Sequence, residues 1–421
     1  MAPEDVSRTT SPVLPVSPLR EDEIETFFAI DAAAFGARMS KGVEELITKA
    51  MNLERIAASR DDGALVGTAA SDASRMTVPG LGGVPAAMVV AVAVLPSHRR
   101  QGRLRALMRY QLDDLRDRGE AVAVLTASEG GIYGRFGYGQ ATFASTYALD
   151  KRVARLARPA RDFASGQVRL IGRNEAADAF PAIYAAYWPT RAGELERGEI
   201  DYLEALGEPG GEDLSRRFYA VYEEADHLDG YAAYEVVSME PPAHGPRRVL
   251  VHELCALTPG SYVALWDFLL GIDLTVELVA RSRPVDEAIK WLLADPRQLR
   301  CTFLGDHAWI RLVDVATCLR ARRYASAGDL VLGLDDHFCP WNSGCYRLVV
   351  SEDGGTAEVS STPRQADVEL DASALASIYL GGVSPLALAD VGRIAPSSEG
   401  AIAAMSRMFA NDRPPYCLTH F

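Results

Sequence analysis

The stretch that decides the fold is Ala87–Gln140, AMVVAVAVLPSHRRQGRLRALMRYQLDDLRDRGEAVAVLTASEGGIYGRFGYGQ. Val89–Leu95 is an uninterrupted run of β-branched and small apolar residues, typical of a strand buried on both faces. Apolar residues then recur at helical spacing through Leu104–Leu115, and Gly119 is suited to end that helix. Ala121–Ala127 is a second apolar run. The order predicts a β-loop-α-β unit with a basic, glycine-containing loop before its helix.

That loop, His98–Arg103, is the first candidate for chemistry. A helix N-terminus offers unpaired N–H groups and a positive dipole end, which together favour phosphate. Gly102 lets the backbone approach an anion closely, and three arginines lie within five residues. A pyrophosphate is the ligand that this pattern indicates, although a basic surface loop before an ordinary helix is the alternative. The loop matches neither the P-loop nor the dinucleotide-binding glycine pattern.

Three stretches carry a family resemblance. Arg99–Leu104 resembles the Arg-x-x-Gly-x-(Gly/Ala) loop of GCN5-related N-acetyltransferases (GNAT), which holds the pyrophosphate of acetyl-CoA. Leu104 stands where that loop has a small residue. Ser128–Gly139, SEGGIYGRFGYG, has five glycines in twelve residues, and the chain ends in Thr419–Phe421. Together these stretches resemble the Eis (enhanced intracellular survival) family of acetyltransferases, along nearly the whole chain.

The resemblance implies a mixed α/β (α+β) fold with two tandem GNAT domains, the second degenerate, and a C-terminal sterol-carrier-protein-like domain. We expect a flexible tail over 1–18, the catalytic domain over 19–150, the degenerate domain over 151–300 and the last domain over 301–421. The residue pattern also supports a second domain of this kind, because the succession of strand, helix and strand recurs over 248–280. Thr258-Pro259-Gly260 stands there in place of the basic loop. The likeness of the last domain is one of fold and gives no reason to expect lipid binding.

The resemblance also assigns the catalytic groups. It implies that the phenol of Tyr133 protonates the sulfur of coenzyme A, and that the α-carboxylate of Phe421 accepts the proton of the amine, directly or through water. A phenol is protonated at neutral pH and a carboxylate attracts an ammonium group, so both roles suit the chemistry. A packing tyrosine in a glycine-rich turn is the alternative for Tyr133.

The same resemblance implies the acetyl-CoA site. The backbone of Val92, Ala93 and Val94 would pair with the pantetheine arm, and one N–H, that of Val94, would face the thioester oxygen. Ser128 and Glu129 would border the pantetheine end. The pyrophosphate would be held by Arg100, Gln101, Gly102, Arg103, Leu104 and Arg105, with Arg99 contributing as the arginine of the motif.

Bulk properties narrow the functional class. A net charge of −14 argues against nucleic acid and suits a cationic substrate. The six cysteines show no C-x-x-C spacing and no histidine pair accompanies them, so we expect no metal and free buried thiols. The N-terminal segment has no apolar signal region and no run approaches the roughly 20 apolar residues of a membrane span, which predicts a cytoplasmic protein that does not enter the membrane.

The acceptor follows from the family, which acetylates amines on multi-amine substrates such as aminoglycosides, and so is linked to antibiotic resistance. Phe35, Trp188 and Trp291 are aromatic candidates for a large pocket, or core and interface residues instead. The resemblance also implies a homohexamer. Two alternatives stay open, a protein or peptide lysine acetyltransferase and a non-catalytic acyl-CoA or lipid-binding sensor. Tyr133 and Phe421 count against the sensor, because a binder needs neither.

Overall fold

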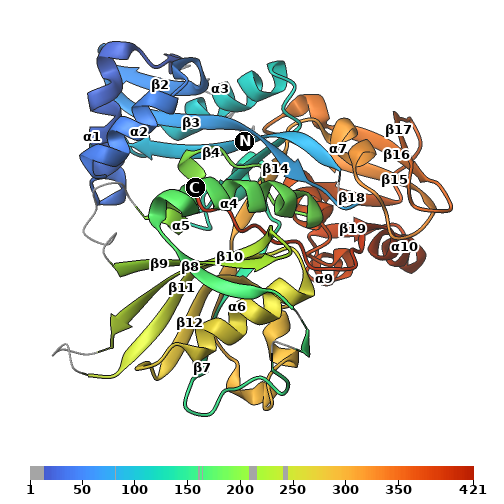
Figure 1. Ribbon diagram of the computed structural model, residues 1–421. Coiled ribbons are helices and arrows are strands. Elements are labelled where there is room, and N and C mark those ends of the chain that lie inside the picture. Colours follow the sequence, from blue (N-terminus) through green and yellow to red (C-terminus); the bar gives the residue numbers. More distant parts are fainter. Residues whose placement is uncertain (1–13, 81, 160–161, 164, 208–215, 240–244) are drawn as a thin grey trace, which may run out of the picture.

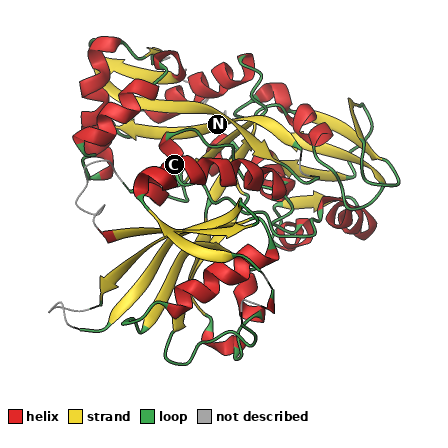
Figure 2. Ribbon diagram, in the orientation of Figure 1, coloured by secondary structure: helices red, strands yellow, loops and turns green. Residues whose placement is uncertain are grey.

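The structure, a computed structural model, describes residues 14–80, 82–159, 162–163, 165–207, 216–239 and 245–421. Three β-sheets with helices packed on them make up the molecule (Figures 1 and 2). The N-terminal part contains β1 (Val16–Pro18), α1 (Ile24–Phe35), α2 (Lys41–Ala50), β2 (Ile56–Asp61), β3 (Ala64–Thr77), β4 (Gly83–Val94), α3 (Arg103–Asp117), β5 (Val122–Thr126), β6 (Gly139–Gln140) and β7 (Phe143–Asp150). The mixed α/β class expected from the sequence is confirmed.

The first sheet has the strand order β1-β2-β3-β4-β5-β14-β6, where β14 is Ala308–Leu312. β4 and β5 are parallel, and α3 connects them. The apolar face of α3, with Leu107, Leu112 and Leu115 buried, packs on this sheet because its leucines recur at helical spacing. The predicted β-loop-α-β unit is therefore present.

The second sheet has the order β13-β7-β12-β11-β10-β9-β8. Its elements are β8 (Gln167–Ile171), α4 (Arg173–Tyr187), α5 (Leu203–Leu206), β9 (Arg217–Glu224), β10 (His227–Ser238), β11 (Arg247–Ala256), α6 (Pro259–Gly271), β12 (Glu277–Pro284) and β13 (Arg300–Asp306). β11 and β12 are parallel and joined by α6, which repeats the plan of the first domain.

The two acetyltransferase-like sheets exchange strands, so the expected boundaries at 150 and 300 do not follow the sheets. β7, from the first expected domain, lies between β12 and β13 of the second sheet. β14, which we expected in the last domain, lies between β5 and β6 of the first sheet. The chain thus crosses between the first two sheets twice, and neither sheet is complete without a strand from outside its own segment.

The third sheet has the order β17-β16-β15-β18-β19. Its elements are α7 (Val315–Ala321), β15 (Gly328–Asp335), β16 (Gly344–Val350), β17 (Ala357–Ser361), β18 (Val368–Asp371), α8 (Ala372–Tyr379), α9 (Pro385–Asp390), β19 (Ile394–Pro396) and α10 (Glu399–Phe409). After α10 the chain forms neither helix nor strand over residues 411–421, and in Figure 1 its C-terminus lies in the middle of the molecule, next to α4 and α5. We call these last eleven residues the strap.

Two further expectations are wrong in part. Residues 1–13 of the expected tail lie outside the described residues, but Val16–Pro18 is not a free tail because it pairs with Ala57–Ser59 of β2. Of the thiols expected to be buried, Cys301 is exposed and Cys345 is half-buried. Within the described ranges, no helix has the length and apolar character that crossing a bilayer requires.

Candidate active site

The central strands separate at the site. β4 pairs with β5 only over Ala86–Met88. Beyond Met88, β4 continues to Val94 and pairs with β3 alone. The register with β3 shifts at Ala91, whose φ of 49° is positive and whose carbonyl accepts a hydrogen bond from the Thr68 hydroxyl at 3.1 Å. A bulge of this kind redirects backbone groups. The edge of β4 that faces β5 therefore has N–H and C=O groups available to an extended ligand.

The basic loop forms the open N-terminus of α3. Gly102 precedes the helix with a φ of 84°, and no described side chain caps the first turn. The equivalent turn of α6 differs, because Thr258 and Ser261 form a reciprocal capping box there. Amide donors are thus left for an anion at α3 and are taken up by side chains at α6.

The arginines of this loop divide into two groups. Arg99 and Arg100 are exposed. Arg103 is buried and turns away from the loop, since its guanidinium pairs with Asp61 at 2.7 Å and donates to the carbonyl of Arg60 at 3.1 Å. Its side chain fixes α3 against β2, and what it offers a ligand is the N–H at the start of the helix.

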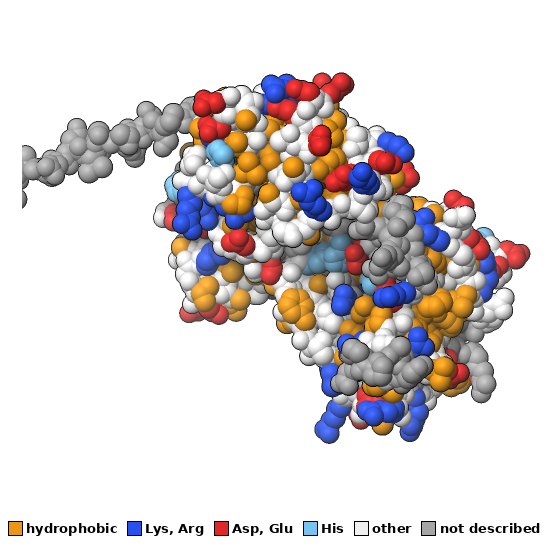
Figure 3. All heavy atoms as spheres, turned by 90° about the vertical axis from the view of Figure 1, so that its left-hand side faces the viewer, with side chains coloured by type: hydrophobic (Ala, Val, Ile, Leu, Met, Phe, Trp, Pro, Cys, Tyr) orange, Lys and Arg blue, Asp and Glu red, His pale blue; other side chains and the backbone are white. Residues whose placement is uncertain are grey.

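A cavity of about 740 Å³ opens beside the diverging strands and gathers the two expected catalytic residues. Tyr133 and Phe421 both line it, together with Val92 and Ser128. Glu129, expected beside Ser128, is not among its lining residues. Figure 3 shows histidine side chains in a hollow between two lobes of the surface, and His420 is one of the residues lining this cavity.

Tyr133 is held in a short turn that follows β5. Burial raises the pKa of its phenol to about 12, and the Glu129 carboxylate adds to the shift. Its ring meets that of Tyr138 edge to face, with 5.8 Å between centroids. Gly137, with a φ of 84°, lies so close to Arg311 that a Cβ would come within 2.8 Å of the guanidinium. Packing against Arg311 therefore explains why a glycine stands at position 137.

Four side-chain carboxylates also line the cavity, and none of them was expected from the sequence. Asp31 lies between Phe27 and Phe35 on one face of α1, because residues four apart share a face. Burial raises the pKa of Asp31 and raises that of Asp201 to about 6. The two others are Asp72 and Glu204.

The strap supplies the opposite wall. His420 lies against His307, with 3.5 Å between Nδ1 of His420 and Nε2 of His307. Burial lowers the pKa of His307 to about 3 and also lowers that of His420. Neither imidazole is charged at neutral pH, so this pair does not compensate the negative charge of the Phe421 carboxylate.

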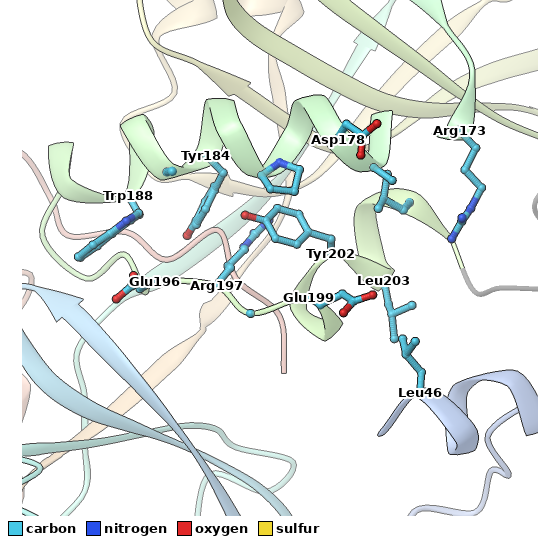
Figure 4. Close-up of a pocket in the computed structure, with 15 residues that line it drawn as sticks. Leu46, Arg173, Asp178, Tyr184, Trp188, Glu196, Arg197, Glu199, Tyr202 and Leu203 are labelled. Atoms are coloured by element: carbon cyan, nitrogen blue, oxygen red, sulfur yellow. The ribbon is translucent and has the colours of Figure 1, made fainter. Parts of the chain in front are cut away.

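A second cavity, of about 780 Å³, lies beneath α4 and does not include Tyr133 or Phe421 in its lining (Figure 4). Leu203 lines both cavities. Of the three aromatic candidates, Phe35 lines the first cavity, Trp188 lines the second and Trp291 lies outside both, 76% exposed. Across the described residues, histidines, cysteines and carboxylates form no group of three able to hold a metal ion.

Comparisons with known proteins agree with this layout. Acetyltransferase (GNAT) domain models match residues 15–141 and 193–312, and a sterol carrier protein domain model matches 315–418. An uncharacterized N-acetyltransferase of Streptomyces coelicolor is 39% identical over 411 residues, covering 94% of this chain and 97% of that protein. The N-acetyltransferase Eis of Mycobacterium tuberculosis is 35% identical over 349 residues, covering 81% and 82%. The crystal structure of Eis1 from Mycobacterium abscessus superposes with a TM-score of 0.84 at 31% identity, covering 97% and 100%.

Proposed function

The chain belongs to the Eis family of GCN5-related N-acetyltransferases, and from this premise we propose that it transfers acetyl groups from acetyl-CoA to multi-amine substrates such as aminoglycosides. In this proposal Tyr133 is the general acid and the Phe421 carboxylate is the general base. The reaction would take place in the cytoplasm, where acetyl-CoA is available, and would confer aminoglycoside resistance where such drugs are the acceptors.

The observation that carries the proposal is the composition of the first cavity. A phenol and a chain-terminal carboxylate line it from elements almost three hundred residues apart in sequence, beside a strand edge with open hydrogen-bonding groups. A lipid-binding sensor would need neither group. Four further carboxylates in the same cavity favour a ligand with several positive charges over a single lysine side chain, because each ammonium group gains from a nearby anion.

The chemistry requires two proton movements. The acceptor amine arrives as an ammonium ion at neutral pH, and the Phe421 carboxylate takes up one of its protons, so that the nitrogen lone pair is free to form the new C–N bond. The C–S bond of the thioester then breaks, and Tyr133 supplies the proton for the departing sulfur. As the amide forms, its nitrogen loses a second proton, and through solvent this proton converts the Tyr133 phenolate back to the phenol. The products are the amide and coenzyme A, and the proton held by the carboxylate passes to solvent and restores the base.

The residues present fit acetyl-CoA. The unpaired edge of Val92–Val94 would receive the pantetheine arm, and an N–H there would stabilise charge that develops on the thioester oxygen. The uncapped start of α3 and the exposed Arg99 and Arg100 would hold the pyrophosphate. We assign Arg103 a structural role for its side chain, and we retain Gln101, Leu104 and Arg105 as loop residues beside the anion.

We also propose self-association, as a homohexamer. β13 is an edge strand of the second sheet, and its Phe303 and Leu304 are 60% and 62% exposed. An exposed apolar edge strand is able to pair with another chain. Light scattering coupled to gel filtration should give the mass of six chains, and a monomer mass would contradict this part of the proposal.

The test of the activity uses protein with an untagged C-terminus. We expect thiol release from acetyl-CoA with aminoglycosides and polyamines, and mass spectrometry should find more than one added acetyl group per aminoglycoside. Release with lysine peptides alone would show a protein acetyltransferase instead. Binding of acetyl-CoA without release for any amine would support the sensor.

A further inference from the structure

The strap is held by a buried cluster that the sequence analysis did not find. The backbone N–H of Leu418 donates to Oε2 of Glu194 at 3.0 Å. One residue later, the hydroxyl of Thr419 lies 3.0 Å from the hydroxyl of Tyr184 and receives a hydrogen bond from Nε of Arg197, also at 3.0 Å. Glu194 and Thr419 have no exposed surface.

Arg197 is itself fixed on all sides. Both terminal nitrogens of its guanidinium bind the carboxylate of Glu253, each at 3.0 Å, and Tyr231 donates to the same carboxylate. The guanidinium lies 4.0 Å from the centre of the Tyr184 ring. Figure 4 shows Tyr184 and Arg197 next to each other beneath α4. A bidentate pair with stacking defines the plane of a guanidinium, so the Nε–H has a fixed direction toward the strap.

The segment that carries this cluster also joins the domains. Gly193 and Glu194 exchange backbone hydrogen bonds with Thr77 of β3. On the other side, Ala192 accepts the N–H of Tyr416 at 2.9 Å, and a Cβ on Gly193 would lie 2.8 Å from the Tyr416 carbonyl. The strap is thus placed relative to the first sheet by residues of the second domain.

From Thr419 the terminal carboxylate is only two residues away. Two residues of extended chain span about 7 Å at most, so fixing Thr419 confines the carboxylate to the neighbourhood of the first cavity. We propose that Glu194 and Arg197 are positioning residues, which hold the strap so that the Phe421 carboxylate stays where the acceptor amine must lose its proton. The inference rests on the proposed function, in which that carboxylate is the base.

The burial of the Glu194 carboxylate destabilises the fold, and this supports a positioning role for Glu194. Burial raises the pKa of this carboxyl to about 7, and its Oε1 has no hydrogen-bond partner among the described residues. A buried, incompletely paired carboxylate destabilises a fold, and an apolar side chain would fill the space at less cost. The other oxygen, Oε2, accepts hydrogen bonds from the Tyr184 hydroxyl and from the Leu418 N–H, each at 3.0 Å, and the second of these ties the carboxylate to the strap.

The test compares Glu194→Ala and Arg197→Met with wild type. We expect kcat to fall about 10- to 100-fold, because small displacements of a catalytic group reduce the rate by this much. The KM for acetyl-CoA should stay within about twofold, because the strap is not part of the basic loop. Carboxypeptidase A should release Phe421 from both variants and leave wild type intact. Glu194→Gln should regain most of the activity, because its amide oxygen accepts the Leu418 N–H.

Glu23→Gln is the matched control. It removes a buried carboxylate that pairs with Arg60 of β2 and not with the strap, and should lower the melting temperature without changing kcat or the release of Phe421. If Glu194→Ala or Arg197→Met does not fold, Thr419→Val and Thr419→Ser replace them, since only serine keeps the hydroxyl. Wild-type kcat in the folded variants, or a loss of kcat with Phe421 still protected, overturns the inference.

A chain extended by two glycines after Phe421 separates the two proposals. An active extended chain shows that the carboxylate is not the base, and the proposed mechanism fails. An inactive extended chain beside fully active Glu194→Ala and Arg197→Met leaves the base in place and overturns the positioning inference alone.

Discussion

Replacing Tyr133 by phenylalanine removes one oxygen from the first cavity. Within the described chain that oxygen makes no hydrogen bond to protein, and the ring keeps its contact with Tyr138. We therefore expect no measurable loss of stability. The effect on turnover should be separate from folding and from acetyl-CoA binding, because the basic loop is untouched.

The size of the effect follows from the pKa of about 12. At pH 7 nearly every Tyr133 phenol is protonated, but a donor of this pKa is a weak acid toward a thiolate, whose conjugate acid has a pKa of about 8.5. Complete transfer would be uphill by about 5 kcal/mol. We therefore expect a loss in kcat of about 10²-fold, at the lower end of the range for general acid catalysis.

The assay follows coenzyme A release with a thiol-reactive chromophore and saturating amine. Tyr138→Phe is the matched control, since it removes a phenol from the same turn whose oxygen is buried and has no hydrogen-bond partner in the described part of the chain. That change should leave kcat intact and cost no stability. Wild-type turnover by Tyr133→Phe, or an equal loss in both variants, would refute the acid role of Tyr133.

Three further outcomes are expected. Asp31→Asn should raise the KM for polyamines several-fold without affecting that for acetyl-CoA, and unchanged kinetics would remove Asp31 from the acceptor site. Gly102→Ala should raise the KM for acetyl-CoA, because a φ of 84° costs a residue with a Cβ about 1 kcal/mol; an unchanged KM would mean that the loop does not contact the ligand. Glu194, with a folded pKa of about 7 against the ordinary 4.5, makes the free energy of unfolding fall by about 3 kcal/mol as pH rises from 4.5 to above 7, since the unfolded chain releases this proton first. Glu194→Gln should abolish this part of the pH dependence of the unfolding free energy, measured by urea titrations at several pH values. An unchanged pH dependence would contradict the assignment. The titratable groups that face Glu194 are Arg191 and Arg197 on its own segment, Tyr184 and Tyr187 on α4, Cys255 on β11, and Tyr416 and Cys417 on the strap.

The sequence was sufficient where the signal is local. The run Val89–Leu95 and the leucine spacing of α3 are local patterns, and the structure contains the unit that they predict. The expected burial of the run on both faces is wrong in part, because only Val89 and Ala93 are buried and the rest of the run is half-buried. Gly102 was singled out because it is a glycine directly before a helix, and its positive φ is the physical reason that a glycine stands there. The aspartate on α1 also had a signal, since Asp31 interrupts an apolar helix face between Phe27 and Phe35.

The sequence was insufficient where placement depends on distant segments. The apolar runs of β7 and β14 would fit either of the first two sheets, and no local pattern says that each joins the other domain's sheet. Three arginines in one loop look alike, yet Arg103 is bound to Asp61. Asp201 and Glu204 reach the cavity because the second domain folds against the first, which no spacing along the chain records.

The proposed acid and base come from different domains, and this bears on why the third domain is present. Tyr133 follows a strand of the first sheet, whereas Phe421 ends a strap that leaves α10 of the third domain and is fixed by residues 191–197 of the second. A first domain alone would contain the strand edge and the basic loop but no terminal carboxylate. On the proposed mechanism, the sterol-carrier-like domain serves catalysis through its last residue, and the degenerate acetyltransferase domain serves it by holding that residue in place. Neither of these roles, if the proposed mechanism holds, requires a lipid or a second acetyl-CoA.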